Sequence, residues 1–118
     1  EHADLSDTYI EQLLAQHTFW AVAAFDGAAV VGGLTAHMLP MTRTESSELF
    51  IYDLAVRADR QRTGVGRQLI AATRSLADAA GVTTVMVPAD VGDTEALAFY
   101  RSLGGEETAV SFFVFANA

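Results

Sequence analysis

A glycine-containing turn in the middle of the chain has the residue types that bind phosphate. Residues 61–66 read Gln-Arg-Thr-Gly-Val-Gly, after an apolar run and before a helical pattern. Glycines allow tight folding that directs several N–H groups toward one point, and a helix N-terminus adds about half a positive charge. The turn therefore suits a diphosphate, with Arg62 and Arg67 as additional donors. The alternatives are an ordinary strand-to-helix turn and a dinucleotide fingerprint, whose third glycine would fall at Leu69.

A carboxylate interrupts the apolar run that precedes this turn. Asp53 lies among hydrophobic residues between positions 48 and 57. A buried carboxylate is costly unless it is paired or reached by solvent. We therefore predict that Asp53 faces a cleft and binds an ammonium group, since a carboxylate is a weak base at neutral pH. A structural ion pair with an arginine is the alternative. Tyr52 is predicted to lie on the other side of the strand and pack in the core.

Three more acidic side chains follow the next apolar segment. Asp90, Asp93 and Glu95 lie where a strand is expected to end and a helix to begin. Several carboxylates in a cleft suit a ligand with several ammonium groups. Asp93 has a second interpretation as the cap of the following helix, which makes Asp90 the stronger candidate for binding.

Charge is distributed unevenly along the chain. The net charge is −8, yet Arg57, Arg60, Arg62 and Arg67 fall within eleven residues that contain one acid, Asp59. This pattern favours a single local anion site on an acidic body that attracts cations. Nucleic acid is not an expected partner, because phosphate neutralisation requires a broad basic surface. The alternative is that the acidity serves solubility alone.

Composition narrows the class of protein. The chain has 118 residues, 51% hydrophobic and 19% charged, which is typical of one globular domain. The absence of cysteine excludes disulfides and thiolate zinc sites, and the absence of lysine excludes a Walker-type loop and Schiff-base chemistry. No metal is expected, since the three histidines share no ligand-like spacing. No apolar run reaches the roughly 18 residues of a membrane span, and the acidic opening segment resembles no secretory signal, so we expect a soluble cytoplasmic domain.

Apolar periodicity predicts a mixed α/β sheet in a single domain. Helices are expected at 5–17, 64–80 and 93–103, and strands at 18–25, 30–40, 48–57, 82–87 and 109–115. Asp26-Gly27 predicts a hairpin between the first two strands. The run 48–57 is typical of a central strand with both faces covered. The buried stripe of the second helix is expected to comprise Val65, Leu69, Ile70, Thr73, Leu76, Ala77 and Ala80.

Two motifs make the chain similar to the GCN5-related N-acetyltransferases, the GNAT family. Their signature after a central strand is Arg or Gln, two residues, Gly, one residue, then Gly or Ala, and Gln61, Gly64 and Gly66 match it. A second family pattern, Asn-x-x-Ala-x-x-Phe-Tyr-x-x-x-Gly, corresponds here to Asp93, Ala96, Phe99, Tyr100 and Gly104. The resemblance covers residues 5–118 and implies the GNAT acyl-CoA N-acyltransferase fold, with the usual first strand and helix expected to be missing.

Within that family, the chain resembles the aminoglycoside 3-N-acetyltransferases of the gentamicin-modifying type. The most specific match is Tyr-Asp-Leu-Ala-Val at 52–56, and further matches lie at 18–26, 29–32, 51, 89–90 and 92–93. The chain departs from these relatives at Ser111, Phe112 and Phe113, where they carry His and then Asp around a Phe. The resemblance therefore leaves the drug range open.

The resemblance implies acetyl-coenzyme A as the cofactor. The glycine turn would bind its pyrophosphate, and backbone N–H groups of a splayed strand would bind the thioester carbonyl and the pantetheine amides. The implied coenzyme-binding residues are Leu54, Ala55, Val56, Gln61, Arg62, Thr63, Gly64, Val65, Gly66, Arg67, Asp93, Ala96 and Tyr100.

Catalytic roles are implied for two of these positions. The resemblance puts the Tyr100 hydroxyl near the sulfur, where a phenol would protonate the leaving thiolate as a general acid. The alternative is that Tyr100 only packs beside Phe99. Asp53 would be the second catalytic residue, and the acceptor amine would be bound by Asp53, Asp90, Asp93 and Glu95.

Together with these residues, the resemblance implies an acetyl-coenzyme A-dependent N-acetyltransferase. It would acetylate the 3-amino group of aminoglycoside antibiotics by direct transfer and so confer resistance. The alternatives are acetylation of a polyamine or another amine, and an acetyl-coenzyme A-binding module without catalysis. The resemblance also implies a homodimer, to which the phenylalanine-rich segment 109–115 would contribute.

Overall fold

The structure divides into two compact units. It is a computed structural model that describes residues 4–117, and the units are Glu1–Pro88 and Ala89–Ala118. The first unit contains α1 (Asp7–Leu14), β1 (Phe19–Asp26), β2 (Ala29–Pro40), β3 (Ser47–Val56), the 3₁₀ turn η1 (Ala58–Arg60), α2 (Val65–Ala79) and β4 (Thr84–Met86). The second unit contains α3 (Thr94–Ser102).

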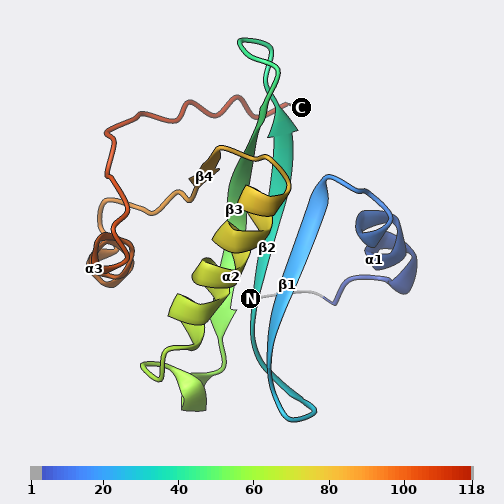
Figure 1. The fold of residues 1–118 in the computed structure, drawn as a ribbon, viewed down its shortest axis with the longest axis vertical. Coiled ribbons are helices and arrows are strands. Elements are labelled where there is room, and N and C mark those ends of the chain that lie inside the picture. The colour runs from blue at the N-terminus through green and yellow to red at the C-terminus, as the bar shows by residue number, and fades with distance from the viewer. Residues whose placement is uncertain (1–3, 118) are drawn as a thin grey trace. The chain divides into compact units, whose positions relative to one another are not determined.

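The first unit is built on a four-stranded mixed sheet. The strand order is β1-β2-β3-β4, in which β1, β2 and β3 pair antiparallel and β4 pairs parallel to β3. Helix α2 lies along one face of this sheet and packs against β1, β2 and β3 (Figure 1). The mixed α and β architecture predicted from the periodicity is therefore confirmed.

The core lies between α2 and the sheet. Its largest fully buried side chains are Leu34, Leu49, Ile51 and Thr73, and the Thr73 hydroxyl donates to the Leu69 carbonyl at 2.8 Å. Leu69, Ile70, Thr73 and Ala77 form the buried stripe of α2. The predicted stripe was too wide, because Leu76 is 52% exposed and Ala80 follows the helix as its exposed cap.

Helix and sheet approach each other most closely at Gly32 of β2. A Cβ atom added there would lie 2.9 Å from Val65 Cγ1 and 3.1 Å from the Ala55 carbonyl oxygen. Val65 is β-branched and opens α2, so it has little freedom to move aside. Gly32 is thus required for the first turn of α2 to reach the sheet.

The substitution Gly32→Ala is expected to destabilise the fold by about 1–3 kcal/mol through overpacking. Gly33→Ala is the matched control, because a Cβ at Gly33 meets only the Val22 carbonyl oxygen, at an ordinary 3.7 Å. Urea denaturation of both variants measures the difference. Equal stability of the two variants would contradict the close contact at Gly32.

A β-bulge changes the expected pattern of β3. Thr35 pairs with Asp53, and the next residue of β2, Ala36, pairs with Ile51, so Tyr52 is the extra residue of β3. The prediction that Tyr52 packs in the core is wrong, since its side chain is 67% exposed. Tyr52 follows the buried Ile51 and so lies on the face opposite α2, and the bulge after it interrupts strict alternation, so that Asp53 shares this face with Tyr52. That face of β3 is open, so the expectation that both faces are covered is also wrong.

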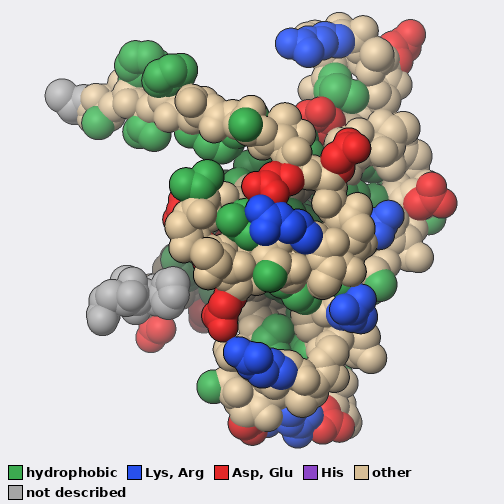
Figure 2. Space-filling view, turned by 90° about the vertical axis from the view of Figure 1, so that its left-hand side faces the viewer, with side chains coloured by type: hydrophobic (Ala, Val, Ile, Leu, Met, Phe, Trp, Pro, Cys, Tyr) green, Lys and Arg blue, Asp and Glu red, His purple; other side chains and the backbone are tan. Residues whose placement is uncertain are grey.

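The segment 109–115 was predicted to be a closing strand, and this is wrong. The described residues of the second unit contain α3 and no strand, and the segment runs without regular secondary structure. An extended segment becomes a strand only when a neighbour completes its hydrogen bonds, and the second unit supplies none. Its large apolar side chains are 68–88% exposed at Val110, Phe112, Phe113, Val114 and Phe115. Hydrophobic side chains line this segment in Figure 2.

Candidate active site

The turn before α2 has the geometry of an anion site. Gly64 precedes the helix in the left-handed conformation, with φ +94°, and no side chain caps the helix N-terminus. Arg62 also has a positive φ, +63°. Uncapped N–H groups at a helix N-terminus together with the helix dipole favour a phosphate. The residues of the turn therefore fit the diphosphate of a coenzyme.

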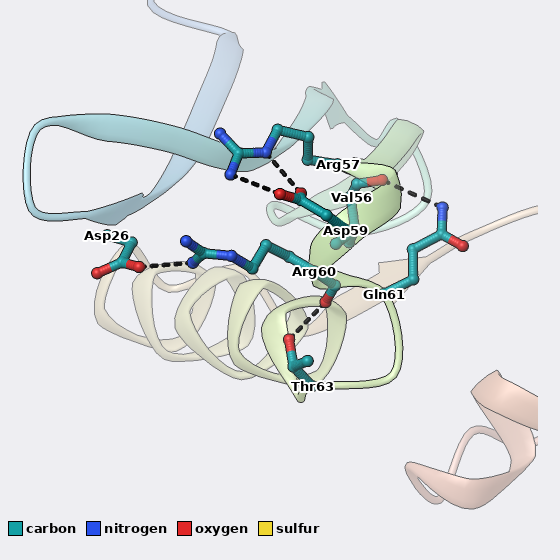
Figure 3. A network of polar contacts seen from close by, with 7 residues as sticks. All are labelled: Asp26, Val56, Arg57, Asp59, Arg60, Gln61 and Thr63. Carbon is teal, nitrogen blue, oxygen red and sulfur yellow. Dashed lines mark hydrogen bonds and ion pairs between the residues drawn. The ribbon is translucent and has the colours of Figure 1, made fainter.

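Two ion pairs brace this turn, as Figure 3 shows. Arg60 Nη1 lies 2.6 Å from Asp26 Oδ2, which joins the turn to the β1–β2 hairpin. Arg57 donates to both carboxylate oxygens of Asp59, at 2.7 and 3.0 Å. The hydrogen bond from Arg57 holds the pKa of Asp59 below its usual range, and the same contact raises the pKa of Arg57.

Because of these ion pairs, the arginines near the turn differ in what they contact. Arg57 and Arg60 are engaged with carboxylates of the protein, whereas Arg67 lies exposed in the first turn of α2. Figure 2 shows arginines beside acidic side chains at the lower end of the face, around the turn that precedes α2. The hydroxyl of Thr63 donates to the Arg60 carbonyl and closes the turn.

Backbone direction along β3 follows from two hydrogen bonds. The N–H of Arg57 donates to the Val31 carbonyl of β2 at 2.8 Å, and the side chain of Gln61 donates to the Val56 carbonyl at 3.2 Å. Successive peptide groups of a strand point to opposite edges. Those of Val56 and Leu54 therefore point away from β2.

That edge of β3 is open over its second half. β4 pairs with β3 only at Glu48, Leu49 and Phe50, and within residues 4–88 no other strand pairs with this edge beyond Phe50. The N–H groups of Leu54 and Val56 thus face an unpaired edge that runs toward the anion turn. Preorganised donors of this kind stabilise a carbonyl oxygen on which negative charge develops.

Asp53 lies on the open face of the sheet. Its Oδ2 accepts a hydrogen bond from the Thr35 hydroxyl of β2 at 3.3 Å. Both residues line a hollow of about 390 Å³ whose other lining residues are Ala21, Val22, Ala23, Val30, Gly32, Gly33, Leu34 and Ala55. A lone carboxylate in an apolar hollow is arranged to bind a cation.

The predicted acidic site residues of the second unit and Ala96 lie around the start of α3. Asp93 is the N-cap, and its Oδ1 accepts from the Ala96 N–H at 3.1 Å. The Asp93 N–H in turn donates to the Asp90 carbonyl at 3.0 Å, and Glu95 lies in the first turn. Asp93 and Ala96 therefore cap one helix together, which was the second interpretation of Asp93.

Tyr100 is held near the end of the same helix. Its ring contacts Phe99, with centroids 5.1 Å apart. Its carbonyl accepts from the N–H of Gly105 at 3.0 Å, and Gly104 has φ +87°, so the helix ends in a Schellman motif. Burial raises the pKa of Tyr100, and the negative charge of Asp93 raises it further.

The raised pKa predicts an alkaline titration for Tyr100. The neutral phenol is the favoured form in the fold, so Tyr100 should ionise with a midpoint above 10.0, and the associated stability is lost as the pH rises through that midpoint. The difference in tyrosinate absorbance between the wild type and Tyr100→Phe isolates this group from the other two tyrosines. A midpoint at or below 10.0 would contradict the assigned burial.

Four aromatic rings beside Asp53 were missed by the sequence reasoning. The His37 ring lies 5.3 Å from Phe19 and 5.7 Å from Tyr52, and Tyr52 lies 6.3 Å from Phe50. A period-two signal in β2 was available, because Thr35 and His37 must share one face of a strand. Phe50 and Tyr52 share a face by the same rule, but their place beside Asp53 was not visible, since the bulge puts Asp53 on that face.

Comparison with known proteins identifies the family. The sequence profile described as "Acetyltransferase (GNAT) family" matches residues 1–104. The chain belongs to the GNAT family of acetyltransferases. Within residues 4–117, no helix is long and apolar enough to cross a membrane.

GNAT relatives of known structure share both fold and sequence with this chain. It is 36% identical, with a TM-score of 0.90, to an aminoglycoside acetyltransferase, meta-AAC0020, from an uncultured soil metagenomic sample in complex with trehalose. The match covers 98% of this chain and 78% of the other. The same enzyme in complex with sisomicin gives 35% identity, a TM-score of 0.90 and the same coverage.

A curated relative is more distant. The chain is 26% identical to N-acetyltransferase family 8 member 3 of Rattus norvegicus over 98% of its length. It spans 50% of the length of that relative.

Proposed function

We propose that the protein is an acetyl-coenzyme A-dependent N-acetyltransferase that acts on an aminoglycoside amine. The observation that carries this proposal is the arrangement along β3. A carboxylate suited to an ammonium, Asp53, directly precedes the outward N–H groups of Leu54 and Val56, and the strand leads into an uncapped anion turn. One continuous segment thus carries a carboxylate for the amine of the acceptor, N–H groups for the acyl carbonyl and a turn for the diphosphate.

Coenzyme binding would use the turn and the open strand edge. The N–H groups of the turn from Gln61 to Arg67 would hold the diphosphate, with Arg62 and Arg67 as charged donors. The backbone of Leu54, Ala55 and Val56 would bind the pantetheine arm and the thioester. Asp93, Ala96 and Tyr100 are proposed to border the coenzyme from α3, as in the family motif. Bound acetyl-coenzyme A supplies the acetyl thioester.

The reaction would be a direct transfer. Asp53 positions the acceptor ammonium, which loses one proton to water or to Asp53 and becomes a nucleophilic amine. The C–N bond forms as the amine attacks the acyl carbon, and the Leu54 or Val56 N–H stabilises the oxyanion. The C–S bond then breaks with its electron pair on sulfur. The Tyr100 hydroxyl donates a proton to that thiolate and becomes a phenolate. The nitrogen of the new C–N bond then loses one proton, which reaches the Tyr100 phenolate through solvent.

Relatives of the chain favour an aminoglycoside as the acceptor. The relative at 35–36% identity is an aminoglycoside acetyltransferase, which was crystallised with sisomicin. The 3-amino position and the resistance role rest on the motif at 52–56. A homodimer and the binding of further ammonium groups by Asp90, Asp93 and Glu95 belong to the same proposal.

A polyamine is the second candidate acceptor. Asp53 in an apolar hollow and a net charge of −8 attract any polycation, so these features do not separate the two classes of amine. A module that binds acetyl-coenzyme A without catalysis would share the anion turn but would have no use for the Tyr100 hydroxyl.

Thiol release from acetyl-coenzyme A tests the function. The full chain is assayed with sisomicin, gentamicin, spermidine and a lysine peptide, and the product is mapped by NMR to the acetylated nitrogen. Acetylation of the aminoglycosides at the 3-amino group is the expected result. Release with spermidine alone would transfer the assignment to polyamines. Coenzyme binding without release for any amine would contradict an enzyme and favour the module.

A further inference from the structure

The open face of the sheet changes character along its length. Strand pairing puts Phe19 opposite His37, His37 opposite Phe50, and Thr35 opposite Asp53, and paired residues share a face. One end of this face therefore carries an aromatic wall, which we define as Phe19, His37, Tyr52 and Phe50. The carboxylate of Asp53 comes next, followed by small residues that line the hollow, namely Ala21, Ala23, Gly33 and Ala55.

The aromatic wall is accessible where it meets the carboxylate. Tyr52 is 67% exposed and its ring stands nearly perpendicular to that of His37, at 83°. The rings of Phe19 and Phe50 are half-buried and support His37 and Tyr52 from the two sides. The exposed Tyr52 ring and the three rings that it joins form one apolar patch beside the hollow, which is the kind of surface that binds a ligand.

Charge complementarity indicates which ligand. Asp53 is the acid that lines the hollow, and the Thr35 hydroxyl orients its Oδ2. A cation held there would lie beside Tyr52, the preceding residue. Aromatic faces attract cations and the C–H groups next to them, and Tyr is among the favoured rings. The occupant must carry an ammonium together with an apolar ring face.

We infer that Tyr52 and His37 bind the ring face of the acceptor while Asp53 binds its ammonium, so that the aromatic wall selects ring-borne amines over linear polyamines. This inference rests on the proposed function and assigns the specificity of the same site. A rigid aminocyclitol presents the ammonium and the ring face in one fixed geometry. A linear polyamine must order several rotatable bonds to make the same two contacts, which weakens its binding.

The test compares two acceptors on three variants of the full chain. Isothermal titration gives the Kd of sisomicin and of spermidine for Tyr52→Ala, Tyr52→Phe and His37→Ala. Tyr9→Ala is the matched control, because Tyr9 is a similarly exposed tyrosine, 53%, on α1. Tyr52 is exposed, so its replacement should leave thermal unfolding unchanged, which is measured alongside.

Loss of the Tyr52 ring should raise the Kd of sisomicin about 5- to 10-fold, the effect of uncovering roughly 40–55 Å² of apolar surface on the ring face of the acceptor. The Kd of spermidine should change less than about twofold, and Tyr52→Phe should restore sisomicin binding, because the ring and not the hydroxyl makes the contact. His37→Ala should follow Tyr52→Ala in direction.

Equal losses for both acceptors, or no loss for sisomicin, would overturn the selectivity. So would an effect of the same size from Tyr9→Ala. The titrations measure binding without turnover, so they distinguish failure of this inference from failure of the proposed function. If the protein is not an enzyme, the difference in Kd between sisomicin and spermidine would persist while thiol release is missing. Conversely, sisomicin acetylation with identical Kd ratios in all variants would support the enzyme and overturn the aromatic wall.

Discussion

Tyr100→Phe should lower kcat by about 10²- to 10⁴-fold, the usual contribution of a positioned general acid. The variant keeps the ring and its contact with Phe99 and removes only the hydroxyl. The raised pKa of Tyr100 keeps the phenol protonated throughout the neutral range, which is the form that a departing thiolate requires. The KM of acetyl-coenzyme A should change by less than about threefold, because the proton transfer belongs to the transition state. Steady-state thiol release with sisomicin measures both constants.

Tyr9→Phe on α1 controls for the general effect of removing a phenol. It should leave kcat unchanged, since Tyr9 is an exposed residue outside the proposed site. If Tyr100→Phe retains full turnover, the hydroxyl is not the acid, and the packing of the ring against Phe99 is the sole role of Tyr100. If coenzyme binding is lost together with turnover, Tyr100 holds the coenzyme and the catalytic assignment is wrong.

Local signals in the sequence predicted most of the helix and hairpin boundaries. Gly27, Gly81 and Gly104 all adopt positive φ, at +61°, +77° and +87°, where a side chain would be strained. Each closes the hairpin or ends the helix that the sequence indicated. The helix predicted at 5–17 is shorter, Asp7–Leu14, because the Ser6 hydroxyl caps it by accepting from the Tyr9 N–H. Signals confined to a few neighbouring residues were sufficient at these points.

Features that need a distant partner were predicted poorly. The bulge at Tyr52 depends on how β3 registers against β2, which the periodicity of β3 alone does not contain. The segment 109–115 has the composition of a strand but no strand in its own unit to pair with. The hydrophobic pattern therefore identified the apolar segments correctly. It wrongly predicted that the segment 109–115 pairs with a neighbouring strand.

In the candidate site, too, local features were predicted from the sequence and contacts between distant residues were not. The anion turn was predicted from glycines and arginines, but the sequence did not distinguish Arg57 and Arg60, which pair with Asp59 and Asp26. Asp26 lies far from Arg60 in the sequence and reaches it only through the hairpin. Counting arginines overestimates the positive charge that a turn offers to phosphate.

Asp53→Asn should lower kcat/KM for the aminoglycoside about 10- to 100-fold, the value of one hydrogen bond to a charged group. The asparagine keeps the shape and still accepts from the Thr35 hydroxyl, so the fold and the hollow should be preserved. Only the negative charge facing the ammonium is removed. The KM of acetyl-coenzyme A should be unaffected, because the anion turn lies beyond the end of the strand. Initial rates at varied concentrations of each substrate give the two values.

Thr35→Val separates the charge of Asp53 from its orientation. The valine removes the donor to Oδ2 while keeping the branched shape, so Asp53 retains its charge but loses one constraint. A loss of about 2- to 10-fold in kcat/KM is expected, smaller than that of Asp53→Asn, because the negative charge remains and only its orientation is released. If both variants unfold at lower denaturant concentration and keep normal kinetics, Asp53 and Thr35 form a structural pair across β2 and β3. If Asp53→Asn alone weakens the acceptor and both variants keep their stability, the carboxylate acts on the ligand, which an isolated charge on an open sheet face predicts.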